Sequence, residues 1–103
     1  MYFNEYQLAA HETAIYQDKM YPIASLIVES AELADLFIKP YLRGDDKKID
    51  KEEIISEAGD VLWNLACVLK DHDITLDEVA QFNLTKLKSR QARGVIQGNG
   101  GKR

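Results

Sequence analysis

The sequence predicts an all-α protein with four helices in one domain. Apolar residues recur at spacings of three and four, and the alternation of apolar and polar residues that is typical of a strand is absent. Prolines, glycines and capping residues divide this pattern into four segments. A chain of 103 residues that is 46% apolar and 29% charged has the size and composition of one globular domain. We expect a helical domain over residues 1–93 and a glycine-rich tail over residues 94–103.

The first two expected helices are bounded by polar caps and prolines. The first runs from Asn4 to Tyr16, and Gln7 stands three residues after the cap, as in a capping box. The second begins at Pro22, which suits the first position of a helix. It is expected to end before Pro40, because the residue that precedes a proline disfavours helical geometry.

The third and fourth expected helices have clearer start signals. The third runs from near Asp50 to about Lys70. The fourth begins with "TLDE", in which Thr75 and Glu78 form the strongest capping box of the sequence, and it runs to about Arg93. The residues after it are rich in glycine, which favours an irregular tail over a fifth helix.

The charge and the cysteine content argue against several classes of protein. A formal net charge of -4 argues against a general nucleic-acid coat, which needs a basic surface. The single cysteine, Cys67, allows no internal disulfide, so a reducing compartment is expected. The first residues lack the pattern of a signal peptide, and no segment approaches the ~18 apolar residues that span a bilayer. We therefore expect a cytoplasmic protein whose partners include neither nucleic acid nor a membrane.

Two pairs of carboxylates occupy matched positions on the second and third helices. At ~100° per residue, Glu57 and Asp60 lie on one shoulder of the apolar face of the third helix, with Asn64 beside them. Glu29 and Glu32 lie on the same side of the second helix relative to its own apolar face. If these two helices pack together, the four carboxylates can converge.

Four carboxylates in a partly dry site cannot remain unpaired, because desolvation and mutual repulsion are both large. They would take up protons, attract Lys or Arg, or bind a hard cation. Mg²⁺ suits oxygen ligands and commonly bridges carboxylates to phosphates. The ordinary alternative is that each pair lies on a solvated face or pairs with a lysine four residues away. Gly59, between the two acids of the third helix, would let a ligand or another backbone approach closely.

A second apolar face of the third helix predicts oligomerisation. Trp63 and Cys67 lie on the side opposite the main apolar face, which is centred on Ile54. A helix that is apolar on both sides lies between layers or at a subunit interface. We favour the interface, because a chain with four helices has few layers of its own. The sequence thus predicts a homo-oligomer that associates through helix packing.

The segments "LIVESAELADLFIK" and "IISEAGDVLWNLACVL" resemble the MazG-like, all-α nucleoside triphosphate pyrophosphohydrolases. "NEYQLAAHETA" is similar to the first helix of that family, and "ITLDEVAQFNLTKLKSRQARG" is similar to its last helix. The order and separation of the two acidic pairs, together with "GDVLW", make the resemblance fairly specific. It implies a four-helix MazG-like module that forms a dimer or a dimer of dimers.

The resemblance also implies an activity and a set of site residues. The activity is Mg²⁺-dependent cleavage of (deoxy)nucleoside triphosphates to monophosphate and pyrophosphate, with Mn²⁺ as a possible substitute metal. The implied metal-binding and catalytic residues are Glu29, Glu32, Glu57 and Asp60. The implied substrate-binding residues are Lys39, Asn64, Asn83, Lys86 and Arg90.

Three positions depart from the pattern of the family. Val28 stands where many members have a glutamate, Asn64 where they often have a tyrosine, and Gly101 where an acid is expected in the tail. The metal set is intact, so these departures bear on base selectivity and on the role of the tail. Two alternatives stay open. One is a dUTP-specific all-α pyrophosphatase, and the other is a non-catalytic helical oligomer that senses nucleotides.

Aromatic and histidine side chains add weaker candidates. Tyr16, Tyr21 and Tyr41 could stack a nucleobase, although plain packing is the more common role of an aromatic ring. His11 and His72 could act as general bases, and His72 falls in a polar break between helices, where a solvated side chain is the ordinary expectation.

Overall fold

The computed structural model describes residues 2–46 and 48–95, and these residues form four helices without a strand. The helices are α1 (Phe3–Glu12), α2 (Met20–Leu42), α3 (Lys51–Asp71) and α4 (Leu76–Ala92). The predicted all-α class is confirmed. Most of the expected glycine-rich tail lies outside the described residues. None of the four helices is long and apolar enough to cross a membrane.

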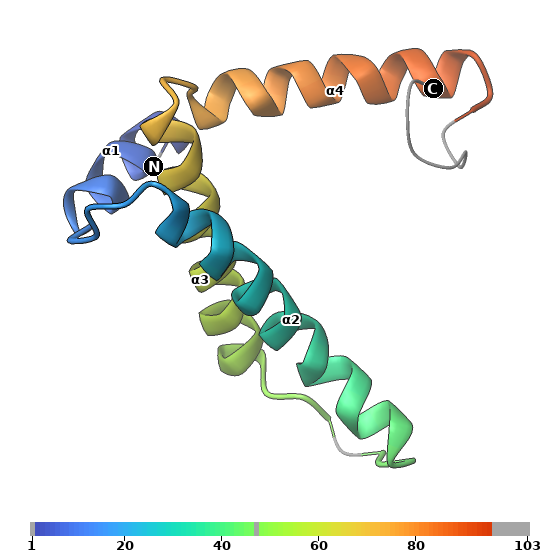
Figure 1. Ribbon diagram of the computed structural model, residues 1–103. Helices are drawn as coiled ribbons and strands as arrows, with labels where there is room; N and C mark the ends of the chain where they lie inside the picture. Colours follow the sequence, from blue (N-terminus) through green and yellow to red (C-terminus); the bar gives the residue numbers. More distant parts are fainter. Residues whose placement is uncertain (1, 47, 96–103) are drawn as a thin grey trace.

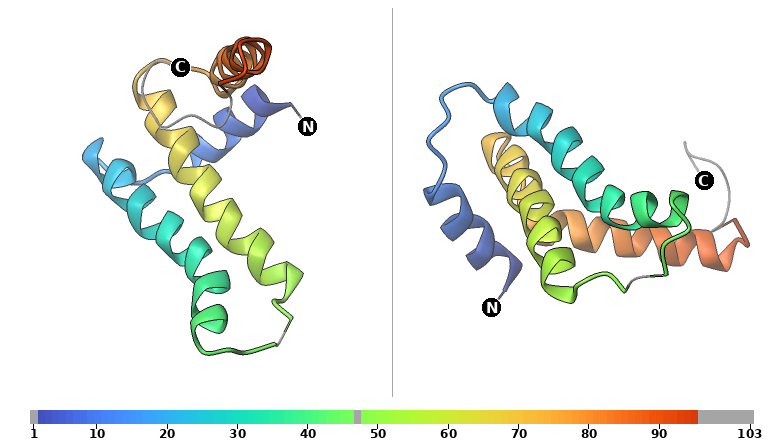
Figure 2. Two further views of the ribbon diagram at one scale, coloured as in Figure 1. Left: turned by 90° about the vertical axis from the view of Figure 1, so that its right-hand side faces the viewer. Right: turned by 90° about the horizontal axis from the view of Figure 1, so that it is seen from below.

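The chain is built around an antiparallel pair of helices. α2 and α3 lie side by side, and α1 packs against another side of α3 (Figures 1 and 2). α4 leaves the end of α3, contacts α1 near its own start and then projects away from the other helices (Figure 1). The fully buried apolar side chains are small, and they include Ala66 and Cys67 of α3.

The start of α1 differs from the sequence prediction. Tyr2 is its N-cap and makes no side-chain capping bond, and the helix ends at Glu12 rather than at Tyr16. The predicted capping box of Asn4 and Gln7 is therefore wrong. The Asn4 side chain instead accepts a hydrogen bond from the Asp77 backbone at the start of α4 (3.1 Å).

Gln7 is buried and ties three helices together. Its amide nitrogen donates to the backbone oxygens of Ala66 (3.1 Å) and Ile74 (2.9 Å). Its side-chain oxygen accepts from the backbone N–H of Leu76 (3.0 Å). A buried amide that satisfies three backbone groups fixes the position of α1 against the end of α3 and the start of α4.

The ends of α2 were also predicted incorrectly. The helix begins at Met20 and continues through Pro40 to Leu42. A proline in the last turn removes only one backbone hydrogen bond, so the helix can pass it before it ends. Gly44, with φ of 66°, supplies the left-handed residue after the helix.

The starts of α3 and α4 follow the sequence prediction. The Asp50 side chain accepts a hydrogen bond from the backbone N–H of Glu52 (3.0 Å). Thr75 and Glu78 form both bonds of a capping box. These local signals set the N-terminal ends of both helices. The acids in each first turn also interact favourably with the positive end of the helix dipole.

The second apolar face of α3 is covered by α1 of the same chain. Cys67 is fully buried, and the Trp63 ring nitrogen donates to the backbone oxygen of Ala10 (3.2 Å) and to the Thr13 hydroxyl (2.8 Å). The prediction that this face is a subunit interface is therefore wrong. The apolar stripe of α1 is weak in the sequence, yet α1 supplies the layer that covers Trp63 and Cys67.

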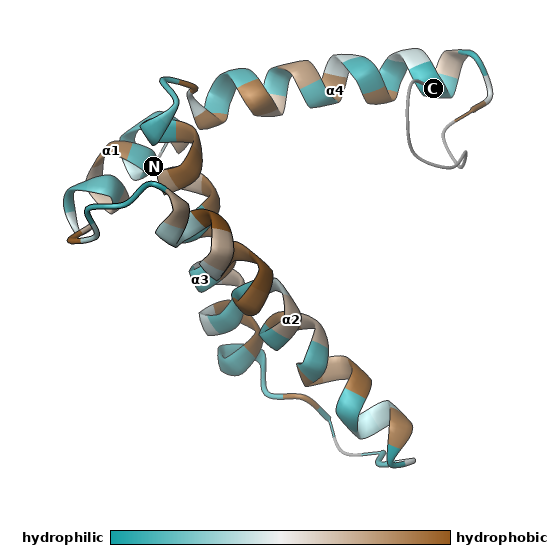
Figure 3. Ribbon diagram, in the orientation of Figure 1, coloured by the Kyte–Doolittle hydropathy of each residue, from teal (hydrophilic) through white to brown (hydrophobic). Residues whose placement is uncertain are grey.

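Apolar side chains remain exposed elsewhere on the chain. Ile27, Val28 and Ile38 of α2 and Phe82 of α4 are among the large exposed apolar residues. Hydropathy colouring shows hydrophobic segments along both helices (Figure 3). Surface of this kind on long helices is typical of protein–protein contact.

Candidate metal centre

Four carboxylates from α2 and α3 lie where the two helices pack side by side. Glu29 and Glu32 are one turn apart on α2, and Glu57 and Asp60 are one turn apart on α3. One oxygen from each of Glu29, Glu57 and Asp60 lies within 4.8 Å of the other two. The charge of Glu32 acts on both Glu29 and Glu57 and raises the pKa of each. The structure thus brings acids of both helices to one place.

The acids of α3 occupy this place because of the apolar residues beside them on the helix. Ala58, Val61 and Leu65 are half-buried along the helix, whereas Asp60 is exposed. Residues three apart share one side of a helix, so Glu57 and Asp60 stay neighbours while the apolar positions pack. The small side chain at position 58 adds little bulk at this contact.

Two of the carboxylates have a buried oxygen without a partner. Glu29 Oε2 and Glu57 Oε2 are buried and accept no hydrogen bond from the described residues. Burial raises the pKa of Glu29, and the charges of Glu32 and Asp60 raise it further. Burial likewise raises the pKa of Glu57, and the same two charges add to the shift. Such orphaned acceptors favour a proton or a cation as their missing partner.

The donor set fits a divalent cation. Mg²⁺ binds oxygen at about 2.1 Å, so opposite ligands lie about 4.2 Å apart. The 4.8 Å within which the three oxygens fall is close to this span, and small side-chain rotations close the difference. The set contains only carboxylate oxygens, which are the ligands that hard cations such as Mg²⁺ and Mn²⁺ prefer.

Asn64 lies against the carboxylates but is held by its own helix. Its side chain is 3% exposed, and its amide nitrogen donates to the backbone oxygen of Asp60 (2.8 Å). Its amide oxygen is buried without a partner in the described chain. Asn64 also lines a hollow of about 190 Å³ together with Glu29 and Asp60. This residue therefore offers one free acceptor at the edge of the acidic cluster.

Gly59 does not make the close approach that its position suggested. It is exposed on α3, and a Cβ added there would meet no atom of the described chain within 4 Å. The close packing expected at this glycine is therefore absent within the described residues.

The candidate phosphate-binding residues lie away from the carboxylates. Lys39 is two turns, or roughly 10 Å, beyond Glu32 along α2, and its ammonium is 3.7 Å from the Asp35 carboxylate. Asn83 and Lys86 line a hollow on α4, with the Lys86 ammonium 5.8 Å from the centre of the Phe82 ring.

Arg90 belongs to the same distant helix. It is buried, and its Nε has no hydrogen-bond partner among the described residues. Because α4 packs mainly against α1, the single chain does not bring the cations of this helix to the acidic cluster.

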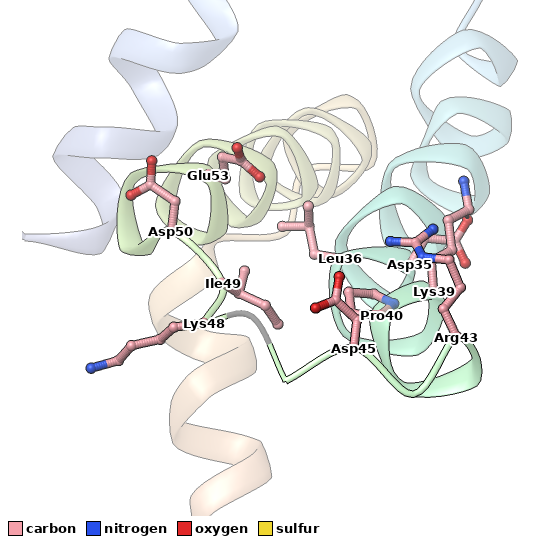
Figure 4. A pocket seen from close by; sticks show the side chains of 10 residues that line it. All are labelled: Asp35, Leu36, Lys39, Pro40, Arg43, Asp45, Lys48, Ile49, Asp50 and Glu53. Atoms are coloured by element: carbon pink, nitrogen blue, oxygen red, sulfur yellow. Dashed lines mark ion pairs between the residues drawn. The ribbon is translucent and has the colours of Figure 1, made fainter.

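A charged hollow of about 520 Å³ lies at the far end of the α2–α3 pair (Figure 4). Lys39 and Arg43 line it from α2, and Asp50 and Glu53 line it from the start of α3. Glu53 is one turn before Glu57, so this hollow lies just before the acidic cluster along α3. Both sides of the hollow contain charges of both signs (Figure 4). Asp35 lies beside Lys39 and Arg43 on α2, and Lys48 lies beside Asp50 on the opposite side.

A buried polar network at the other end of α3 escaped the sequence analysis. Asp71 accepts hydrogen bonds from His11 (2.9 Å) and from the Tyr16 hydroxyl (2.6 Å), and its backbone oxygen accepts from Lys19 (3.1 Å). Burial alone would raise the pKa of Asp71, but the bonds from Tyr16 and His11 outweigh it and lower the pKa. His11 is thus engaged in holding α1 and the α1–α2 link onto α3. No spacing rule in the sequence connects these residues, because they come from distant segments.

Comparison with known proteins identifies a family. Residues 17–95 match the model of the MazG nucleotide pyrophosphohydrolase domain. The chain is also similar to the Gene 37 protein of Mycobacterium phage L5, with 38% identity over 115 aligned positions that cover all of both chains. That name states no activity. No solved structure gives a significant match.

Proposed function

Because the chain belongs to the MazG nucleotide pyrophosphohydrolase family, we propose that it hydrolyses (deoxy)nucleoside triphosphates to nucleoside monophosphate and pyrophosphate with the help of Mg²⁺. The observation that carries the proposal is the convergence of Glu29, Glu57 and Asp60, two of which have a buried oxygen without a partner. Carboxylates in this state are suited to hold a cation between the protein and a phosphate chain.

The four acids would share the binding of the metal and the activation of water. Glu29, Glu57 and Asp60 would hold the cation, with Glu32 completing the set. The metal would supply charge neutralisation on the phosphates and a lower pKa for the attacking water. Burial and the neighbouring carboxylates raise the pKa of Glu29, so its carboxylate takes up a proton more readily than that of an ordinary glutamate, which suits a general base. We assign proton abstraction to Glu29 or Glu32.

The proposed reaction is an attack of water on the α phosphorus. A new bond forms between the water oxygen and the α phosphorus, while the bond from that phosphorus to the bridging oxygen breaks. Pyrophosphate leaves with the bridging oxygen, and the proton of the water passes to the carboxylate of Glu29 or Glu32. Asn64 would orient the substrate through its free amide oxygen, which lies at the edge of the cluster.

Phosphate oxygens that the metal leaves uncovered need cationic partners. Lys39 is on the same helix as Glu29 and Glu32, and a chain of phosphates can extend toward it along α2. Asn83, Lys86 and Arg90 are carried by α4, which projects from its own chain (Figure 1). We infer that α4 meets the carboxylates of a second copy, and that the protein is a homo-oligomer, a dimer or a tetramer.

Product analysis tests the proposed reaction. The protein is incubated with Mg²⁺ and each common ribo- and deoxyribonucleoside triphosphate, and the products are separated. Monophosphate with pyrophosphate is expected, and Glu57→Gln should lower the rate by at least ~10²-fold, as the loss of one catalytic electrostatic contact does. Glu12→Gln is a matched control, because Glu12 is exposed at the end of α1.

Other outcomes would contradict the mechanism or favour one of the two alternative functions. Diphosphate as the first product, or an unchanged rate in Glu57→Gln, would contradict the mechanism. Hydrolysis of dUTP alone would identify the dUTP-specific alternative. Absence of hydrolysis for every triphosphate would leave the non-catalytic nucleotide-sensing oligomer as the better reading of the site.

A further inference from the structure

An aromatic hollow of about 550 Å³ lies next to the carboxylates. Its walls come from the link between α1 and α2, from Tyr21 at the start of α2 and from Trp63 of α3. Tyr21 and Trp63 also line the smaller hollow that contains Glu29 and Asp60. The two hollows are therefore neighbours, and two aromatic rings stand at their boundary.

Two of the three rings of this hollow, Tyr16 and Trp63, are held in place at their polar ends. The Tyr16 hydroxyl is bound by Asp71, and the Trp63 ring nitrogen is bound by Ala10 and Thr13. The ring of Tyr16 stacks on that of Tyr21 at a centroid distance of 5.8 Å, and it lies nearly perpendicular to the ring of Trp63 at a centroid distance of 6.2 Å. Rings fixed in this way lose little freedom when a flat ligand binds.

Apolar side chains around the hollow are exposed to solvent. Tyr21 is 57% exposed although it belongs to the stacked pair, and Ile15 in the link is 96% exposed. These side chains contribute little to the core of the chain. They leave apolar surface directly beside a cluster that favours cations and phosphates.

The order of these groups along the helices matches the order of groups in a nucleotide. Trp63 follows Asp60 by three residues, or about 4.5 Å of helix. Tyr21 precedes Glu29 by eight residues, or about 12 Å of helix. A ligand with its phosphates at the carboxylates thus has its opposite, flat end at the aromatic rings.

We propose that this aromatic hollow is the nucleobase subsite, in which the base stacks on Tyr21 and Trp63. The inference rests on the proposed function for the placement of the phosphates, and it names the residues that bind the other end of the substrate. Every base has a π face, so stacking holds purines and pyrimidines alike. The exposed ring of Tyr21 would contribute to the affinity for the base. The carboxylates would act on the phosphate chain.

Fluorescence provides a direct test, because Trp63 is the sole tryptophan of the chain. The full-length protein is titrated with AMP and UMP in the presence of Mg²⁺, and ribose 5-phosphate serves as the matched ligand without a base. Both nucleotides should change the emission of Trp63 with a saturable curve, and ribose 5-phosphate should not.

Three variants locate the effect. Tyr21→Ala should weaken nucleotide binding by roughly 5- to 150-fold, which is the range for losing one stacked base. Tyr21→Phe keeps the ring and should retain the affinity. Tyr2→Ala removes a tyrosine that is 78% exposed at the start of α1, and it should bind as the wild type does.

The possible outcomes separate this inference from the proposed activity. Equal responses to nucleotide and ribose 5-phosphate, or unchanged affinity in Tyr21→Ala, would overturn the subsite. A Trp63 signal that depends on protein concentration and not on nucleotide would show that a second copy covers the hollow, which also overturns it. Saturable binding at Trp63 without hydrolysis would support the subsite and contradict the activity. Hydrolysis with an unchanged KM in Tyr21→Ala would support the activity and contradict the subsite.

Discussion

Two carboxylates of α3, those of Glu57 and Asp71, have pKa values that their surroundings shift in opposite directions. Glu57 is surrounded by other acids and has a buried oxygen without a partner, so burial and repulsion raise its pKa. Asp71 is also buried, but hydrogen bonds from Tyr16 and His11 hold its pKa below the usual value. Asp71 is therefore satisfied within the chain, whereas Glu57 is suited to a ligand from outside.

At Asp60, we predict a direct effect on metal binding. Millimolar Mg²⁺ or Mn²⁺ should raise the melting temperature of the wild type, because ligand at ~100 times Kd stabilises the folded state by ~2.7 kcal/mol. Asp60→Asn should lose most of this rise. Without metal, the same variant should be at least as stable as the wild type, because one of the clustered charges is removed. Thermal scans with metal and with EDTA check both expectations, and an equal metal-induced rise in the two proteins would exclude Asp60 from the site.

At Asp71, we predict a stability effect that depends on pH. Its folded-state pKa is below the ordinary 3.8, so its contribution is fully present above that value and is lost as the pH falls through the folded pKa. Asp71→Asn should cost roughly 1.5–3 kcal/mol at pH 7, as the loss of hydrogen bonds to a charged group does. The difference should shrink below pH 3.8.

Urea unfolding at pH 7 and at several pH values below 4 measures the effect at Asp71. Asp73→Asn is the matched control, because Asp73 is exposed two residues further on and its φ of 60° suits asparagine. A cost for Asp71→Asn that stays constant down to low pH would show that charge is not the cause.

At the scale of single helices, α3 contains an interior glycine with open space around it. Gly59→Ala should stabilise the metal-free protein by ~1 kcal/mol, because alanine favours the helix and no described atom lies within 4 Å of the added carbon. For a domain of this size, that gain corresponds to roughly 4–8 °C in melting temperature. A lower melting temperature would show that a second copy packs against this turn of α3.

The helices were predictable where the signal is local. Asp50 and Thr75 cap the helices that follow them, and each cap involves only residues within three positions. The passage of α2 through Pro40 was not predictable from a rule about single residues, because the cost of a proline depends on its distance from the helix end. The role of Gln7 depends on three segments that meet only in the folded chain.

The acidic cluster was largely predictable from helix geometry. Glu29, Glu57 and Asp60 lie on regular helices, so the angle per residue fixes the side on which they lie. The aromatic hollow was not predictable, since Tyr16 and Trp63 are brought together by a link and by the packing of α1. Their proximity is a tertiary property that no periodicity reports.

At the scale of the whole molecule, the chain exposes more surface than a compact monomer of its mass. Its accessible surface is 8043 Å², against ~5,900 Å² for a typical monomer of this size. Its radius of gyration is 16.5 Å, against ~13 Å for a compact chain of this length. The excess surface is larger than the ~800 Å² that each partner buries in a standard interface. The shape therefore favours association through the projecting α4 and the exposed side of α2.

We predict that the protein is at least a dimer and that Phe82 on α4 contributes to the contact. Phe82 is 71% exposed in the single chain, so Phe82→Glu would do little to an isolated monomer. In an oligomer the same change places a charge in an apolar interface and should shift the mass toward that of one chain, 11.7 kDa. Light scattering at micromolar concentration measures the mass, and circular dichroism checks that the helices remain.

Tyr2→Glu is the matched control for this experiment, because Tyr2 is similarly exposed, at 78% against 71% for Phe82, but lies at the start of α1. A wild-type mass of one chain would contradict oligomerisation itself, and an unchanged oligomer in Phe82→Glu would remove α4 from the contact. Loss of both the oligomer and the pyrophosphate release in Phe82→Glu, with the Trp63 response to AMP preserved, is the expected combination. It would mean that the base binds within one chain while the cations of α4 reach the phosphates from another.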